Sequence, residues 1–140
     1  MRIMGLDVGK KTIGVAISDE NSITAQPLKT VMRASRDKDM KALKETIREF
    51  EIESIVVGLP VNMDGTYGPQ SQLVLKFIET LKTETGLPVE PWDERLSTIA
   101  VTKVLIEGDI SRKKRKEVVD KMAASYILQG YLDSKRRPCS

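Results

Sequence analysis

The chain has no histidine and only one cysteine, Cys139, which lies next to the C-terminus. Without histidine there is no Ser-His-Asp or Cys-His catalysis, no histidine general base and no histidine metal ligand. A single cysteine forms neither an intramolecular disulfide nor a cysteine-based zinc site, which fits a reducing compartment. Any chemistry must therefore come from carboxylates, hydroxyls, amines and metals bound through oxygen.

Long apolar runs are also missing. No stretch approaches the length of a membrane span, and the first residues lack the apolar region of a signal peptide. We therefore expect a cytoplasmic protein with no membrane partner. The 140 residues, 40% hydrophobic and 31% charged, suit one soluble domain over residues 1–140.

The charge is mildly positive and unevenly distributed. Lys and Arg total 23 against 20 Asp and Glu, giving a net charge of +3, which is compatible with a polyanionic partner. Five cations are consecutive near the start of a predicted helix: Arg112, Lys113, Lys114, Arg115 and Lys116. Cations at a helix N-terminus oppose its dipole, so contact with phosphates explains this run better than a solvated helix surface does.

The first 19 residues predict a β-hairpin with strands over residues 3–8 and 12–18. A two-residue loop at Lys10-Lys11 determines the register of this hairpin. One face then carries a carboxylate and almost no other side-chain bulk, from Gly5, Asp7, Gly14 and Ala16. A helix, a metal ion or a phosphate can approach such a face closely, while the opposite, apolar face must be buried.

Beyond the hairpin, strand and helix patterns alternate. We expect strands over residues 27–32, 54–59 and 88–94, and helices over 37–50, 70–83, from 97 or 98 to 108, and from the basic run to 133. Three antiparallel strands followed by right-handed crossovers predict an α/β fold. Its five-stranded mixed sheet would carry helices on both faces.

Acidic residues occur where such a sheet would bring them together, at the carboxyl ends of its strands. Asp7 ends the first strand, Asp93 and Glu94 end the last, and Asp120 lies on the last helix. Adjacent strand residues point to opposite faces, so only one of Asp93 and Glu94 shares a face with Asp7, and periodicity leaves that choice open. A solvated surface role for these acids also stays open at this point.

If the acids do meet, their repulsion favours a bound cation, and oxygen ligands suit Mg²⁺ or Mn²⁺. Two such ions about 4 Å apart can clamp a phosphodiester and activate a water. A metal-dependent hydrolase of this kind needs no histidine.

Four blocks, in order and spanning nearly the whole chain, resemble the YqgF/RuvX family. They are GLDVGKKTIGVAISD at 5–19, GLPVNMDGTYGPQ at 58–70, DERLST at 93–98 and SRKKRKEVVDKMAASYILQGYLD at 111–133. The family is described as Holliday junction resolvases and as pre-16S rRNA processing nucleases. The resemblance implies a ribonuclease H-like fold and a metal-dependent endonuclease acting on structured nucleic acid.

The resemblance also implies roles for single residues. Asp7, Glu94 and Asp120 would be the catalytic triad that binds Mg²⁺ or Mn²⁺ at a two-metal site, which selects Glu94 over Asp93. Nucleic acid would contact Lys10, Lys11, Asn62, Asp64, Arg95, Arg112, Lys113, Lys114, Arg115 and Lys116. Thr12 departs from the pattern, because many members carry Arg there; whether Lys10 or Lys11 replaces that charge is open.

Two other functional classes remain open. The hairpin also resembles the first phosphate loop of the actin-like ATPase and sugar-kinase superfamily, whose members close a cleft between two domains. A protein with this fold can also bind nucleic acid, or assist ribosome assembly, without turnover. The sequence does not choose between branched DNA and precursor rRNA, and we expect a monomer or weak dimer that also meets ribosomal particles.

Overall fold

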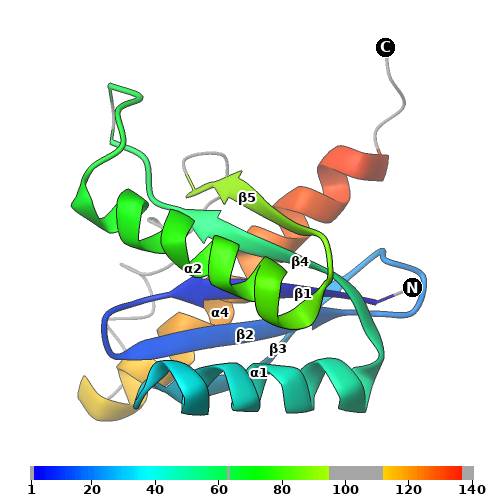
Figure 1. Cartoon of the computed structure of the whole chain (residues 1–140). Helices are drawn as coiled ribbons and strands as arrows, with labels where there is room; N and C mark the ends of the chain where they lie inside the picture. The colour runs from blue at the N-terminus through cyan, green and yellow to red at the C-terminus, as the bar shows by residue number, and fades with distance from the viewer. Residues whose placement is uncertain (1, 63, 95–111, 137–140) are drawn as a thin grey trace.

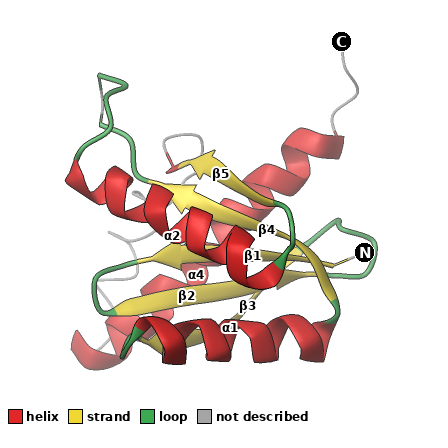
Figure 2. Cartoon of the chain, viewed as in Figure 1, coloured by secondary structure: helices red, strands yellow, loops and turns green. Residues whose placement is uncertain are grey.

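The structure is a computed structural model that describes residues 2–62, 64–94 and 112–136, with the backbone alone for 112–120 and 136. Its strands are β1 (Arg2–Val8), β2 (Thr12–Ser18), β3 (Ala25–Met32), β4 (Ile52–Leu59) and β5 (Val89–Asp93), and its helices are α1 (Arg36–Phe50), α2 (Pro69–Thr85) and α4 (Arg112–Arg136). Figure 1 shows α1 and α2 in front of the sheet and α4 behind it. This three-layer arrangement is also clear in Figure 2.

The five strands form one mixed sheet in the order β3-β2-β1-β4-β5. The pairs β1/β2 and β2/β3 are antiparallel, whereas β1/β4 and β4/β5 are parallel. The predicted sheet, with its first three strands antiparallel and helices on both faces, is thus confirmed. The carboxyl ends of β1, β4 and β5 lie at one edge, at the left of Figure 1, where open α/β sheets place ligand sites.

The hairpin of β1 and β2 has the predicted register. Asp7 pairs with Gly14 and Gly5 pairs with Ala16. The turn is closed by the Gly9 amide, which donates to the Thr12 carbonyl oxygen at 2.8 Å. A two-residue loop was therefore enough to assign the faces of both strands correctly.

Several elements are longer than predicted. β3 begins at Ala25 rather than at residue 27, β4 at Ile52 rather than 54, α2 covers Pro69–Thr85 rather than 70–83, and α4 reaches Arg136 rather than 133. β3 starts early because Ala25 pairs with Ser18 and its amide donates to Gln129 Oε1 at 2.8 Å. The predicted helix ending at residue 108 lies outside the described residues. No helix within the described ranges has the length and apolar character of a membrane span.

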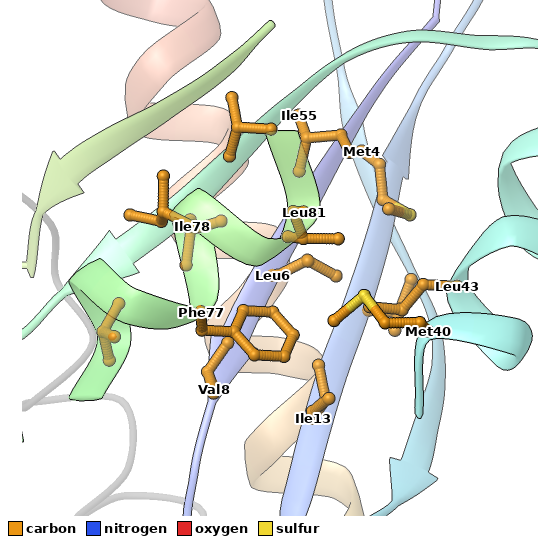
Figure 3. Packing of buried hydrophobic residues seen from close by; sticks show 14 of the residues in the cluster. Met4, Leu6, Val8, Ile13, Met40, Leu43, Ile55, Phe77, Ile78 and Leu81 are labelled. Atoms are coloured by element: carbon orange, nitrogen blue, oxygen red, sulfur yellow. The ribbon is translucent and has the colours of Figure 1, made fainter. Parts of the chain in front are cut away.

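A large apolar core separates the sheet from α1 and α2. Figure 3 shows side chains of both helices meeting those of the central strands. Among the residues fully buried there are Met4, Leu6, Ile13, Val15, Leu43, Val57, Val74 and Leu81. Burial of each such side chain contributes roughly 1.5–3 kcal/mol, so this core holds the sheet against both helices.

The opposite face of the sheet packs against α4 through a smaller core. Its core contains Ile3, Ala16, Val56, Ala123, Ala124, Ile127, Leu128 and Leu132. A Cβ at Gly5 would lie 2.7 Å from the Leu128 Cβ and 3.1 Å from the Ala124 carbonyl oxygen. Of the three possibilities for the bare face of the hairpin, a closely approaching helix is therefore realised at Gly5.

We predict that Gly5→Ala destabilises the protein by about 1–3 kcal/mol, because backbone and a rigid Cβ of α4 must move to admit the methyl group. Urea unfolding followed by circular dichroism measures this loss. Gly68→Ala is the control, since the nearest atoms to a Cβ there are those of the Asn62 side chain at 3.5 Å or more, which leaves only the modest preference for glycine over alanine at the N-cap of α2. Equal losses in the two variants would contradict tight packing at Gly5.

Candidate active site

Asp7 lies near the carboxyl end of β1 with a glycine on each neighbouring strand. Gly14 of β2 pairs with it directly. On the other side, Leu6 pairs with Val57 of β4, so Gly58 is the residue beside Asp7. Because neither glycine carries a side chain, groups from other elements can approach the half-buried Asp7 closely.

Glu94 follows the last residue of β5 and lies on the same face as Asp7. Trp92 pairs with Gly58, and Glu94 is two residues further along the chain. The Oε1 atom of Glu94 lies 2.9 Å from the place a Cβ would take on Gly58. Asp93, in contrast, pairs with Leu59, which is buried in the core under α1 and α2. The ambiguity between these two acids is resolved in favour of Glu94 on the face of Asp7.

Asp120 is placed by the backbone of α4. Ala124, one turn later, has its carbonyl oxygen close to Gly5, whereas Leu132 packs in the same cluster as Ile3, near the start of β1. The helix therefore runs opposite to β1, and Asp120 occupies a position toward the end of the strand where Asp7 lies. Within the side chains that the structure describes, which exclude that of Asp120, no three acidic groups form a metal cluster. The triad remains a prediction.

The predicted cationic contacts to nucleic acid fall in three groups. Lys10 and Lys11 are exposed at the tip of the β1–β2 turn, at the same edge as Asp7. Arg95 lies outside the described residues. The backbone of Arg112, Lys113, Lys114, Arg115 and Lys116 forms the first turns of α4, and their side chains are not described. Of these predicted cations, the structure brings Lys10 and Lys11 to the acidic edge through described side chains.

Asn62 and Asp64 are exposed in the loop after β4, and both bind Thr66. The Thr66 hydroxyl donates to Asp64 Oδ1 at 2.6 Å, and the Thr66 amide donates to the same oxygen at 3.0 Å. Asn62 Nδ2 donates to the Thr66 hydroxyl oxygen at 2.9 Å. Their polar groups thus give the loop a defined shape at the carboxyl end of β4.

The start of α2 ties this loop to the central strands. The Ser71 hydroxyl donates to the Pro60 carbonyl oxygen, and Gln70 Nε2 donates to the Val8 carbonyl oxygen at 3.5 Å. Both ends of the loop are therefore attached to rigid elements next to Asp7.

Arg33 is a residue of this edge that sequence reasoning missed, because it lies in a polar connection before α1. Its Nη1 donates to the Gly9 carbonyl oxygen at 2.8 Å, and its amide donates to the Lys11 carbonyl oxygen at 2.9 Å. Its guanidinium also pairs with the buried Asp39 at 3.4 Å and lies 5.6 Å from the Phe77 ring centroid. Arg33 therefore fastens the turn that carries Lys10 and Lys11 to both helices. The only local signal for such a role in the sequence was the position of Arg33 directly after a predicted strand.

Thr12 is buried, with 4% of its surface exposed, so it adds no accessible charge. The cationic groups described around the turn are instead the side chains of Lys10, Lys11 and Arg33.

Trp92 is partly buried and packs against the core beneath α4 rather than forming an exposed stacking surface. It meets Tyr131 edge-on with ring centroids 5.9 Å apart. Burial, with a smaller contribution from the Glu90 carboxylate, raises the pKa of Tyr131. This aromatic pair fixes β5, and with it the chain leading to Glu94, against α4.

The donor set suits a hard divalent cation. Asp7 and Glu94 offer oxygen ligands from one face, and the missing side chain of Gly58 lets Glu94 Oε1 lie beside Asp7. Mg²⁺ and Mn²⁺ favour such ligands, together with retained waters. The described part of the site therefore fits the metal expected from the sequence.

The fold resembles that of two solved resolvases. RuvC of T. thermophilus, solved in complex with a Holliday junction, matches with a TM-score of 0.61 and 15% identity, covering 97% of both chains. The fowlpox virus resolvase, solved with junction DNA, matches with a TM-score of 0.58 and 14% identity, covering 98% of this chain and 100% of that one. These similarities show that the chain has the ribonuclease H-like α/β fold.

Sequence similarity identifies the family. The family model described as "RuvX: Holliday junction resolvase" matches residues 1–134. A protein of Clostridioides difficile named "Putative pre-16S rRNA nuclease" is 58% identical over 134 residues, covering 96% of this chain and 95% of the relative. The chain belongs to the RuvX family, as the four sequence blocks predicted.

We predict that Gly58→Ala costs about 1–3 kcal/mol, because its Cβ would collide with Ile127 Cδ1 and press on Glu94 Oε1. Ile127→Val removes the colliding methyl group and alone costs about 0.5–1.5 kcal/mol. The double variant should therefore lose less than the sum of the two single losses, as measured by urea unfolding. Strictly additive losses would show that a side chain at position 58 does not meet Ile127.

Proposed function

We propose that this protein is an endonuclease that hydrolyses phosphodiester bonds in precursor 16S rRNA, using Mg²⁺ or Mn²⁺ held by Asp7, Glu94 and Asp120. The observation that carries the proposal is the placement of Glu94 over Gly58, beside Asp7, in a chain with the ribonuclease H-like fold. The choice of RNA rests on relatives more than 50% identical that are named for pre-16S rRNA.

Each group has a distinct part in this mechanism. Asp7 and Glu94 would hold the ions from one face, and Asp120 would close the site from α4. When bound, the metal supplies an activated water at neutral pH and offsets negative charge on the phosphate. Attack of water in line on phosphorus forms one P–O bond and breaks the bond to the leaving oxygen.

The polar groups around the acids would position the RNA. Lys10 and Lys11, exposed on a turn braced by Arg33, would pair with phosphates next to the cleaved one. Asn62 and Asp64, in a loop ordered by Thr66, would line the path of the strand beyond β4. Arg95 and the basic start of α4, Arg112 to Lys116, would extend this contact. The protein would work as a single domain, as a monomer or weak dimer.

Resolution of branched DNA is a second candidate function. The matching family is described as a Holliday junction resolvase, and two similar structures contain junction substrates. Family membership and the placement of Glu94 both favour a nuclease over an actin-like phosphate-binding domain. A non-catalytic binding or assembly role gives no reason for the carboxylates of Asp7 and Glu94 to lie on one face.

We predict that Asp7→Asn lowers the rate of Mg²⁺-dependent cleavage by more than about a hundredfold. Loss of a residue that merely supports a metal ligand costs about 10–100-fold, and a ligand itself should cost more. Mg²⁺ should also raise the melting temperature of the wild type but not of this variant, because binding stabilises only a protein with an intact site. Asp93→Asn, on the opposite face, is the matched control and should retain both responses. Cleavage by purified Asp7→Asn protein would overturn the proposal.

A second prediction concerns the substrate. We expect faster cleavage of an RNA carrying the 5′ precursor segment of 16S rRNA than of a four-way DNA junction, with either Mg²⁺ or Mn²⁺. The two substrates are compared side by side at equal enzyme concentration, with Asp7→Asn as the blank. Faster cleavage of the junction would show that branched DNA is the preferred substrate. Binding of both substrates without cleavage of either would favour an assembly role.

A further inference from the structure

Two hollows lie between α1 and α2 and share Met40 as a wall, but they differ in charge. One combines three cations with three carboxylates, from Lys41, Lys44, Arg48, Asp37, Glu45 and Glu84. Within it, Lys44 and Glu84 form an ion pair at 2.8 Å. The other hollow contains three cations, Arg33, Arg36 and Lys76, and a single carboxylate, that of Asp39. We call this second hollow the basic hollow.

The one carboxylate of the basic hollow is already neutralised. Asp39 is buried, with 4% of its surface exposed, and accepts hydrogen bonds from Arg33 Nε and from the Ala34 amide. Arg36 and Lys76 are exposed, and neither forms an ion pair with another described residue. Arg36 does help to lower the pKa of Glu84, but less than the hydrogen-bonded Lys44 does. Two positive charges therefore remain available to an anion.

The basic hollow is continuous with the edge that carries the acids. Arg33 lines it and also binds the carbonyl oxygens of Gly9 and Lys11 in the β1–β2 turn. Figure 1 shows α1 and α2 both beginning on the side of the molecule where this turn lies. A strand of nucleic acid held at Lys10 and Lys11 can therefore continue across Arg33 into the basic hollow.

The lining is also partly apolar. Leu73 is 55% exposed at its rim, and the ring of Phe77 lies beneath Arg33. A free inorganic anion would use only the two cations, whereas a nucleotide also offers a sugar and a base to cover Leu73. Charge and shape together favour a polynucleotide segment over a small anion.

We propose that the basic hollow binds a segment of the same RNA that the acidic edge cleaves, with Arg36 and Lys76 on its phosphates and Leu73 against a sugar or base. This inference rests on the proposed function for the identity of the RNA. It adds a contact surface on the α1/α2 side, opposite the face that carries α4.

The test measures binding of a fluorescein-labelled RNA with the 5′ precursor segment of 16S rRNA, in EDTA, from 50 to 200 mM KCl. The variant Arg36→Ala/Lys76→Ala is compared with Lys41→Ala/Arg48→Ala, which removes the same charge from the balanced hollow between the same helices. We expect the first variant to lose about 2 from the slope of log K against log salt and to bind about tenfold more weakly at 150 mM. The control should change by less than half as much.

Equal effects in the two double variants, or none in either, would overturn the inference. All four substituted side chains are exposed, and urea unfolding verifies that both variants fold as the wild type does. The same titration with a four-way DNA junction tests the other occupant, and a loss confined to the junction would also overturn the RNA proposal.

Cleavage assays separate this inference from the proposed function. Measured over a range of RNA concentrations that reaches saturation, Arg36→Ala/Lys76→Ala should keep the wild-type kcat and show a raised KM. The basic hollow binds RNA but takes no part in the cleavage step. Cleavage by Asp7→Asn would refute the nuclease mechanism while leaving the binding result standing. A wild-type salt slope in Arg36→Ala/Lys76→Ala would refute RNA binding at the basic hollow while leaving the nuclease mechanism standing.

Discussion

The contact between α4 and the bare face of β1 is the constraint on which the rest of this structure depends. At Gly5 the helix approaches so closely that its own backbone and the Leu128 Cβ occupy the space of a side chain. Packing at that distance allows very little sliding, because interiors are as dense as organic crystals. The contact therefore sets how far along β1 each turn of α4 lies. It thereby sets the position of Asp120 along the direction of β1, relative to Asp7.

The same lack of side chains serves a different purpose at the other end of the strand. Around Gly5 the space is filled by backbone and Cβ of α4, whereas at Gly58 it is taken by the end of the Ile127 side chain and by Glu94 Oε1, next to Asp7. Clustered carboxylates repel one another, so they stay close only if the scaffold holds them there. Here the scaffold is a central sheet whose other face is sealed by the large core under α1 and α2. The large apolar core that stabilises the fold thus lies on the face of the sheet opposite the carboxylates of Asp7 and Glu94.

Most of the architecture could be predicted because it follows from local patterns. The two-residue loop gave the register of β1 and β2, and apolar runs gave the crossover strands and helices. Element ends were less predictable, since the early start of β3 depends on Gln129, more than a hundred residues away. Periodicity did not separate Asp93 from Glu94, because that choice depends on the pairing of β5 with β4. Arg33 escaped notice for a related reason, since its partners come from the turn, α1 and α2.

The separation of charges in this molecule implies a division between binding and chemistry. Of the described side chains to which we assign phosphate contacts, Lys10 and Lys11 lie at the turn, and Arg36 and Lys76 lie toward α1 and α2. The acids lie on the face that carries α4. A phosphate drawn in by the cations is repelled by the carboxylates, and the repulsion grows as it approaches them. Tight binding alone therefore cannot bring the scissile group to the acids. In the proposed nuclease, a cation held between the carboxylates would reverse the sign of that last interaction, so affinity for RNA and competence to cleave it would depend on different residues.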